Sequence, residues 1–114
     1  MKIDRNNAEH YLWGENCDGW HLVKNSDLSI IQERMPPNTY EVRHYHNKSR
    51  QFFFILSGTA TLEVDGEVIE LRALEGYEVP PRVPHQMLNK TNMNVEFIVT
   101  SQPNSRGDRV LTNT

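Results

Sequence analysis

From residue 20 onward, short hydrophobic runs alternate with polar segments, and this pattern predicts a series of β-strands. The runs lie at 20–23, 28–35, 40–46, 51–56, 60–64, 67–71, 77–79, 85–89 and 95–100, separated by turns rich in Gly, Pro and Asn. Runs of this length between turn residues are typical of strands. No stretch has a convincing helical period, so the chain is expected to be all-β, an antiparallel sandwich or barrel.

The segment 60–71 predicts one hairpin in detail. Asp65-Gly66 is a two-residue turn signal. If Val64 lies opposite Glu67, every apolar side chain of the two strands falls on one face, because side chains alternate along a strand. That buried face would consist of Ala60, Leu62, Val64, Ile69 and Leu71.

Composition and charge narrow the function classes. The chain has 114 residues, which suits one domain, and a formal net charge of −3 without a run of Lys or Arg. We therefore expect no nucleic-acid or membrane partner. Residues 1–19 are expected to form an irregular N-terminal arm, 20–100 the barrel and 101–114 a C-terminal tail. The single Cys17 and a polar start without a signal-peptide pattern predict a cytoplasmic protein.

Three histidines and one glutamine have the spacing of a metal site. His44 and His46 are two residues apart in a predicted strand, so they share a face and can chelate one ion. Gln51 opens the next strand, and His85 follows a rigid Pro-rich turn. Imidazole ligands suit several divalent transition metals, and zinc, nickel, manganese and iron all remain open. His10 and His21 have no partner at such spacing and are read as structural.

These two segments resemble the motifs of the cupin superfamily. The first motif is matched by His44, His46, Gln51 and Gly58, with Gln where the family usually has an acid. The second is matched by Gly76, Pro80-Pro81-Arg82, His85 and Asn89, with a shorter gap after Gly76 and with Arg82 in place of the usual turn glycine. The resemblance implies an RmlC-like antiparallel jelly-roll β-barrel. It also implies metal-ligand roles for His44, His46 and His85, and assigns the fourth role to Gln51.

Gln51 changes the expected chemistry of such a site. A neutral amide lowers metal affinity but leaves the ion a stronger Lewis acid, so we expect a ligand that brings its own carboxylate. Some small cupins that process unsaturated uronates resemble this variant. The alternative is that Gln51 marks a metal-free, decayed site.

Further residues are candidates for lining the pocket. By strand parity these are Tyr40, Phe53, Met87 and Asn89, although Tyr40 could instead belong to the core and Asn89 could tie loops. Arg34 could hold an anion if its face of the strand points inward; otherwise it is solvated. No catalytic residue can be assigned, since no general base stands out and Glu33, Glu63 and Glu78 cannot be placed in the cavity.

The sequence thus predicts a metal-binding monocupin that uses a divalent ion as a Lewis acid on a small carbohydrate acid or other small polar metabolite. The alternatives are a non-catalytic small-molecule or sugar-binding cupin, a cupin dioxygenase and a structural barrel. Phe52, Phe54 and Leu56 should face outward, opposite in parity to Gln51. Such a patch predicts a homodimer, unless residues 1–20 cover it.

Overall fold

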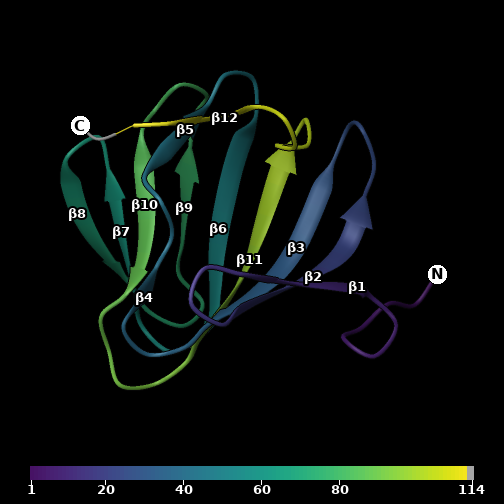
Figure 1. Ribbon diagram of the computed structural model, residues 1–114, viewed down its shortest axis with the longest axis horizontal. Coiled ribbons are helices and arrows are strands. Elements are labelled where there is room, and N and C mark those ends of the chain that lie inside the picture. The colour runs from purple at the N-terminus through teal and green to yellow at the C-terminus, as the bar shows by residue number, and fades with distance from the viewer. Residues whose placement is uncertain (113–114) are drawn as a thin grey trace.

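Twelve β-strands form the secondary structure of residues 1–112, the part of the chain that the computed structural model describes (Figure 1). No helix in this part is long and apolar enough to cross a membrane. The strands are β1 Glu9–Trp13, β2 Cys17–Lys24, β3 Ser29–Met35, β4 Thr39–Tyr40, β5 His44–His46, β6 Arg50–Ser57, β7 Ala60–Val64, β8 Glu67–Leu71, β9 Gly76–Val79, β10 His85–Asn89, β11 Val95–Gln102 and β12 Arg109–Leu111.

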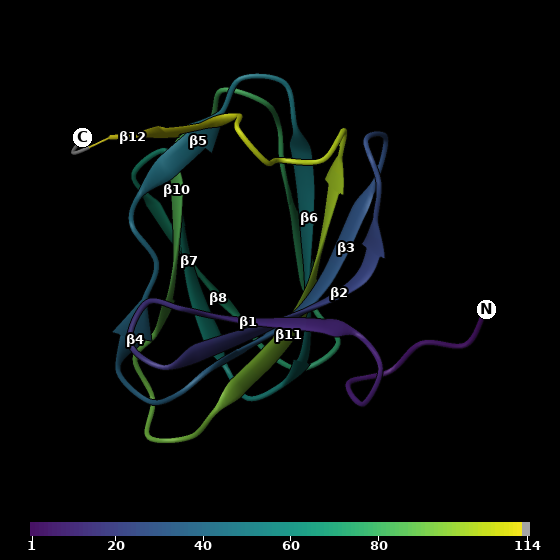
Figure 2. The ribbon, with the colours of Figure 1, turned by 45° about the vertical axis from the view of Figure 1, so that its right-hand side comes forward.

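The strands form two antiparallel sheets that face each other. One has the order β1-β2-β3-β11-β6-β9, and the other has the order β12-β5-β10-β7-β8, with β4 paired to β10. Figure 2 shows them as opposite walls of a barrel. Several neighbouring strands, such as β3 and β11 or β5 and β10, come from distant parts of the sequence, as in a jelly roll. The predicted all-β antiparallel barrel is therefore confirmed.

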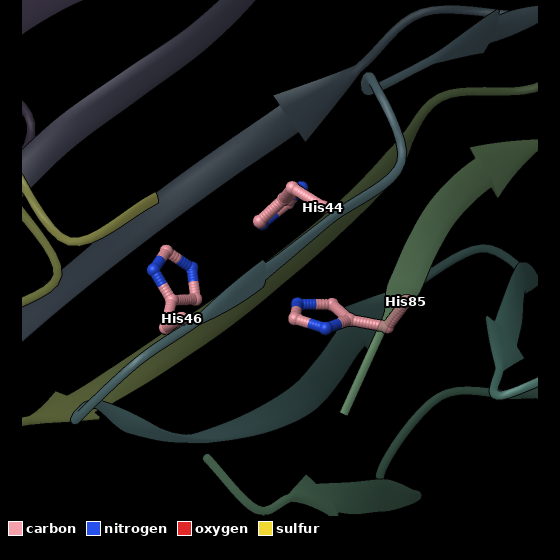
Figure 3. A group of neighbouring side chains, drawn as sticks. All are labelled: His44, His46 and His85. Carbon is pink, nitrogen blue, oxygen red and sulfur yellow. The ribbon is translucent and has the colours of Figure 1, made fainter. Parts of the chain in front are cut away.

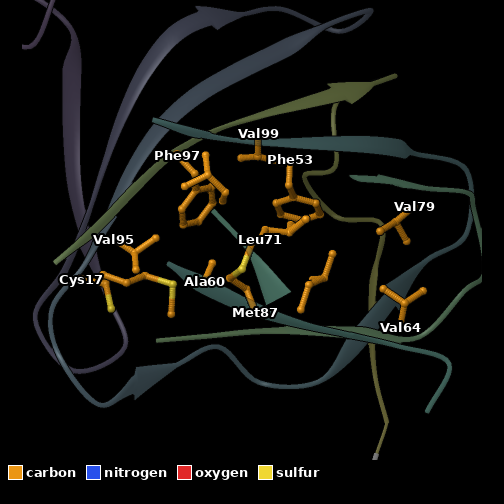
Figure 4. Close-up of a cluster of buried hydrophobic side chains, with 13 residues drawn as sticks. Cys17, Phe53, Ala60, Val64, Leu71, Val79, Met87, Val95, Phe97 and Val99 are labelled. Atoms are coloured by element: carbon orange, nitrogen blue, oxygen red, sulfur yellow. The ribbon is translucent and has the colours of Figure 1, made fainter. Parts of the chain in front are cut away.

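The hairpin β7–β8 has the predicted register. Val64 pairs with Glu67, Leu62 with Ile69 and Ala60 with Leu71. Ala60, Leu62 and Leu71 are buried in the core (Figure 4). The core also takes Phe53 and Ile55 from β6 and alternate residues of β10 and β11, so side chains from both sheets interdigitate between the walls.

Two predicted irregular segments contain strands. Residues 1–19 were expected to be an arm, but β1 lies within them and pairs with β2. The tail contains β12, which pairs with the His44–His46 strand β5. Neither β1 nor β12 has an alternating apolar pattern. Backbone pairing with a neighbouring strand holds each of them in place instead. Residues 113–114 of the predicted tail lie outside the described residues.

The predicted strand at 40–46 is interrupted. Residues 41–43 lie between β4 and β5, and the Glu41 side chain there accepts a hydrogen bond of 2.8 Å from the backbone N–H of Met87. The Glu41 carboxylate thus takes the place of a backbone carbonyl as the acceptor for the Met87 N–H. The interruption leaves Tyr40 exposed and His44 buried, although the two have the same parity.

The outward aromatic patch on β6 is present. Phe52 is 42% exposed, Leu56 is also exposed, and the rings of Phe52 and Phe54 stack at 6.3 Å. The hairpin β1–β2 lies at the far edge of the same sheet, separated from β6 by β3 and β11. Residues 1–20 therefore do not cover the patch within one chain.

Candidate metal centre

Three buried histidines converge on one space inside the barrel (Figure 3). His44 and His46 project from β5, and His85 projects from the neighbouring strand β10, where it lies directly opposite His44. One nitrogen from each ring can be chosen so that all three lie within 4.8 Å of one another. The structure therefore brings together the three histidines that the sequence pointed to.

Backbone carbonyls set the proton positions on two of these rings. Nδ1 of His44 lies 2.7 Å from the carbonyl oxygen of Val42, and Nδ1 of His85 lies 3.0 Å from that of Val83. Because a carbonyl only accepts, each Nδ1 carries the hydrogen and each Nε2 presents a lone pair. Burial lowers the pKa of His44 to about 3 and also lowers the pKa of His85. Both rings are therefore neutral at neutral pH.

Gln51 reaches the same space from β6 in the opposite sheet. Its amide nitrogen donates to Ser101 Oγ at 3.0 Å, which turns the amide oxygen toward His85. Gln51 Oε1 lies 3.1 Å from His85 Nε2. With its hydrogen on Nδ1, His85 has a lone pair on Nε2 that can bind an ion, and Gln51 Oε1 lies close enough to bind the same ion. Burial disfavours protonation of His85.

His46 has the unsatisfied polar atoms that a metal ligand would leave. Both of its ring nitrogens are buried and lack a hydrogen-bond partner among the described residues. Burial lowers the pKa of His46 to about 4, so the ring is neutral. A buried polar group that has no partner within the protein is suited to binding an ion. The chemistry of these four residues, three imidazoles and an amide oxygen, fits a divalent transition metal.

The turns beside His46 hold it in place. The N–H of Arg82 donates to the His46 carbonyl at 2.6 Å, with Arg82 in the left-handed region at φ 68°. This conformation explains why cupins usually have glycine at this position. The carboxylate of Asp108 accepts the N–H groups of residues 47–49, which anchors the loop after β5 to the segment before β12.

The cavity beside the histidines has a volume of about 380 Å³ and is lined in part by Glu33, Glu41, Arg109 and Tyr11. Burial, and next the charge of Glu41, raises the pKa of Glu33 to about 8. Burial also raises the pKa of Glu41 to about 7. Neither acid was expected in the cavity. Glu33 has the parity of Ile31 and Met35, but the other face of β3 also carries an apolar residue, Ile30, so alternation alone did not indicate which face points inward.

Several predicted pocket residues lie elsewhere. Arg34 is on the outer face of β3, ion-paired with Asp18, so it does not hold an anion in the cavity. Phe53 and Met87 belong to the hydrophobic core, where the Phe53 ring packs against the His85 ring at 5.8 Å.

Asn89 and Tyr40 also differ from expectation. Asn89 ties loops: its amide nitrogen donates to the carbonyls of Met35, Pro36 and Met93. Tyr40 is 61% exposed and lines a neighbouring hollow, apart from the histidines.

Comparison with known proteins agrees with this architecture. The family model described as "Cupin domain" matches residues 31–101. An H2HPP isomerase of Bacillus subtilis is 28% identical over 103 residues, which span 83% of this chain but only 43% of that protein.

Among solved structures, KdgF from Halomonas sp. superposes with a TM-score of 0.84 at 13% identity, covering 93% of this chain and 96% of that one. A sugar phosphate isomerase of the cupin superfamily from Silicibacter pomeroyi has a TM-score of 0.80 at 18% identity, covering 98% of this chain and 92% of that one. These structural likenesses show the fold alone.

Proposed function

This chain belongs to the cupin family, and we propose that it is an enzyme that binds one divalent transition metal on His44, His46, His85 and Gln51. We further propose that it acts without redox change on a small polar molecule bearing a carboxylate, such as a carbohydrate acid. The observation that carries the proposal is the convergence of three buried, neutral imidazoles, one of which, His46, has no hydrogen-bond partner for either ring nitrogen among the described residues.

The charge of the ligand set supports a carboxylate-bearing substrate. Three neutral imidazoles and a neutral amide leave the charge of a divalent ion uncompensated, so an anionic group is attracted to it. A bound ion would supply Lewis-acid polarisation of a substrate oxygen. Arg109 adds a cation at the edge of the same cavity.

The cavity acids support proton-transfer chemistry. Burial raises the pKa values of Glu33 and Glu41 in the metal-free protein, and the charge of a bound cation would lower them again, so both carboxyls are candidates to hold and release a proton in this cavity. Isomerases and lyases need this property, and the similar protein of Bacillus subtilis is named an isomerase. The buried free Cys17 is consistent with the reducing cytoplasm that we expect.

Elemental analysis of untagged protein tests the metal site. We expect about one equivalent of a single transition metal, as one ligand set predicts, and its loss in His46→Ala. His21→Ala is the matched control, because His21 lines the same cavity but stands outside the three-histidine cluster. A protein that stays metal-free after reconstitution with zinc, nickel, manganese and iron would overturn the proposal.

The preference for carboxylates is tested separately. Calorimetric titration of metal-loaded protein with acetate, glycolate and glucuronate should give binding that disappears when the metal is removed. Neutral analogues, such as acetamide and methyl glucoside, serve as controls. If the metal-loaded protein binds none of these carboxylates, the proposed class of carboxylate-bearing substrates is wrong. If the activity depended on iron and consumed oxygen, the protein would be a dioxygenase rather than an enzyme that acts without redox change.

A further inference from the structure

A second hollow adjoins the histidine cavity. It has a volume of about 280 Å³ and is lined by Trp13, Gly14, Tyr40 and Val42, together with four residues that also line the first cavity. The shared four are Tyr11, Glu33, Glu41 and Arg109. The two hollows are therefore neighbouring lobes, an inner lobe at the histidines and an outer lobe. Small-molecule pockets typically measure about 300–1,000 Å³; the inner lobe lies at the lower end of this range and the outer lobe just below it.

The N-terminal hairpin builds the aromatic wall of the outer lobe. Trp13 ends β1, and its indole N–H donates to the carbonyl of Asp18 at 3.3 Å, which fixes the ring. The Tyr11 ring lies directly over Gly19, where a Cβ would come within 2.2 Å of it. Both rings are held in place before a ligand arrives.

Tyr40 supplies a third ring from β4. Its side chain is exposed, and its backbone lies against the β1–β2 turn at Gly14. The β1–β2 hairpin and β4 lie near each other (Figure 2), and residues of both line the outer lobe. Aromatic rings with little freedom are good partners for the face of another ring.

The junction between the lobes presents hydrogen-bond acceptors. Glu33 Oε2 accepts from the Tyr11 hydroxyl at 3.2 Å, and Glu41 Oε2 accepts from the Met87 N–H. In each carboxyl the other oxygen is left for a ligand, and Glu41 Oε1 is 4.0 Å from His44 Nδ1. A hydroxyl group can donate to a carboxylate oxygen and accept from a protonated carboxyl, so it suits both of these side chains.

We propose that the outer lobe is a subsite for a hydroxyl-bearing six-membered ring, belonging to a molecule whose carboxylate extends into the histidine lobe. The ring lies against Trp13 and Tyr40, and its hydroxyl donates to Glu33 or Glu41. Both a phenol and a sugar ring have this chemistry. The placement of the carboxylate depends on the function proposed above, whereas contact between the ring and Trp13 or Tyr40 needs no metal.

Trp13 provides a direct readout. The chain has two tryptophans, so a Trp20→Phe parent leaves Trp13 as the only indole. We would titrate this parent, metal-free, with 4-hydroxyphenylacetate, phenylacetate, glucuronate and acetate and follow the fluorescence. If the Trp20→Phe protein does not fold, the Trp13 indole N–H resonance of the unmodified chain reports the same contact.

We expect a saturable fluorescence change with 4-hydroxyphenylacetate or with glucuronate. The compound that binds identifies the preferred ring as a phenol or a sugar. Acetate should give no signal. Removal of the hydroxyl in phenylacetate should weaken binding about fivefold or more if the ring is a phenol. Tyr40→Ala should weaken binding about three- to tenfold, while Tyr45→Ala, on the opposite face of β5, should not.

The outcomes separate the subsite from the metal site. A metal-loaded protein whose Trp13 signal responds to neither ring overturns the subsite and leaves the metal proposal standing. Ring binding in a protein that never takes up metal supports the subsite and overturns the proposed function. Equal binding by phenylacetate and 4-hydroxyphenylacetate, with no response to glucuronate, overturns the role of the hydroxyl and its carboxyl acceptors.

Discussion

Replacing Glu33 with glutamine should stabilise the metal-free protein, and increasingly so as the pH rises. Burial, and next the charge of Glu41, raises the pKa of Glu33 from 4.5 to about 8 in the folded state. Glutamine has nearly the same shape, and its oxygen can still accept the hydrogen bond from Tyr11. The substitution therefore removes the titration and leaves the packing nearly unchanged.

The sign follows from the direction of the pKa shift. The unfolded chain releases the Glu33 proton at lower pH than the folded chain does, so the carboxyl destabilises the fold progressively between pH 4.5 and about 8. For a fully shielded group, this loss between about pH 5 and about pH 7.5 amounts to roughly 3 kcal/mol. Glu33 is only half-buried. We therefore expect about half of that value, about 1.5 kcal/mol.

Urea unfolding of chelator-treated protein at the two pH values measures this change. The stability of Glu33→Gln relative to the parent should increase by about 1.5 kcal/mol from about pH 5 to about pH 7.5. Glu67→Gln, at an exposed position in the β7–β8 hairpin, is the control and should show no such change. A pH-independent difference between Glu33→Gln and the parent would refute the reasoning.

Four further outcomes are expected. Asn89→Ala should lower the free energy of unfolding by about 2–4 kcal/mol, because it leaves buried carbonyls without their donor; a chemical denaturation curve unchanged from the parent would contradict this. Asp108→Asn should lower it by about 1–2 kcal/mol and speed amide exchange in the loop after β5, since an amide cannot accept all three N–H groups. Arg82→Gly should raise it by about 0.5–1 kcal/mol through relief of the left-handed backbone, and a lower melting temperature would count against that explanation. We also propose that the exposed aromatic patch on β6 forms a homodimer, so light scattering at micromolar concentration should show a dimer that Phe52→Lys disrupts; a strict monomer would remove this proposal.

Local periodicity was sufficient for much of the barrel and for the shared face of His44 and His46. The register of β7–β8 followed from one turn and five apolar residues, because a slip by one position would turn every apolar side chain to the solvent. His44 and His46 share a face for the same reason. Gln51 and His85 could be added because each opens a strand next to a recognisable turn or loop.

Only the tertiary structure decided what surrounds that centre. Both faces of β3 mix polar and apolar residues, so alternation could not show that Glu33 points into the cavity and Arg34 out to Asp18. The strands β1 and β12 have no amphipathic pattern, and pairing with distant backbone brings Tyr11, Trp13 and Arg109 to the cavity. The sequence by itself placed His44 and His46 on one face, because strand geometry acts over a few residues, and the resemblance to the cupin motifs added Gln51 and His85 as candidate ligands. The walls of the pocket depend on contacts between segments that are far apart in the chain, and no local pattern records those contacts.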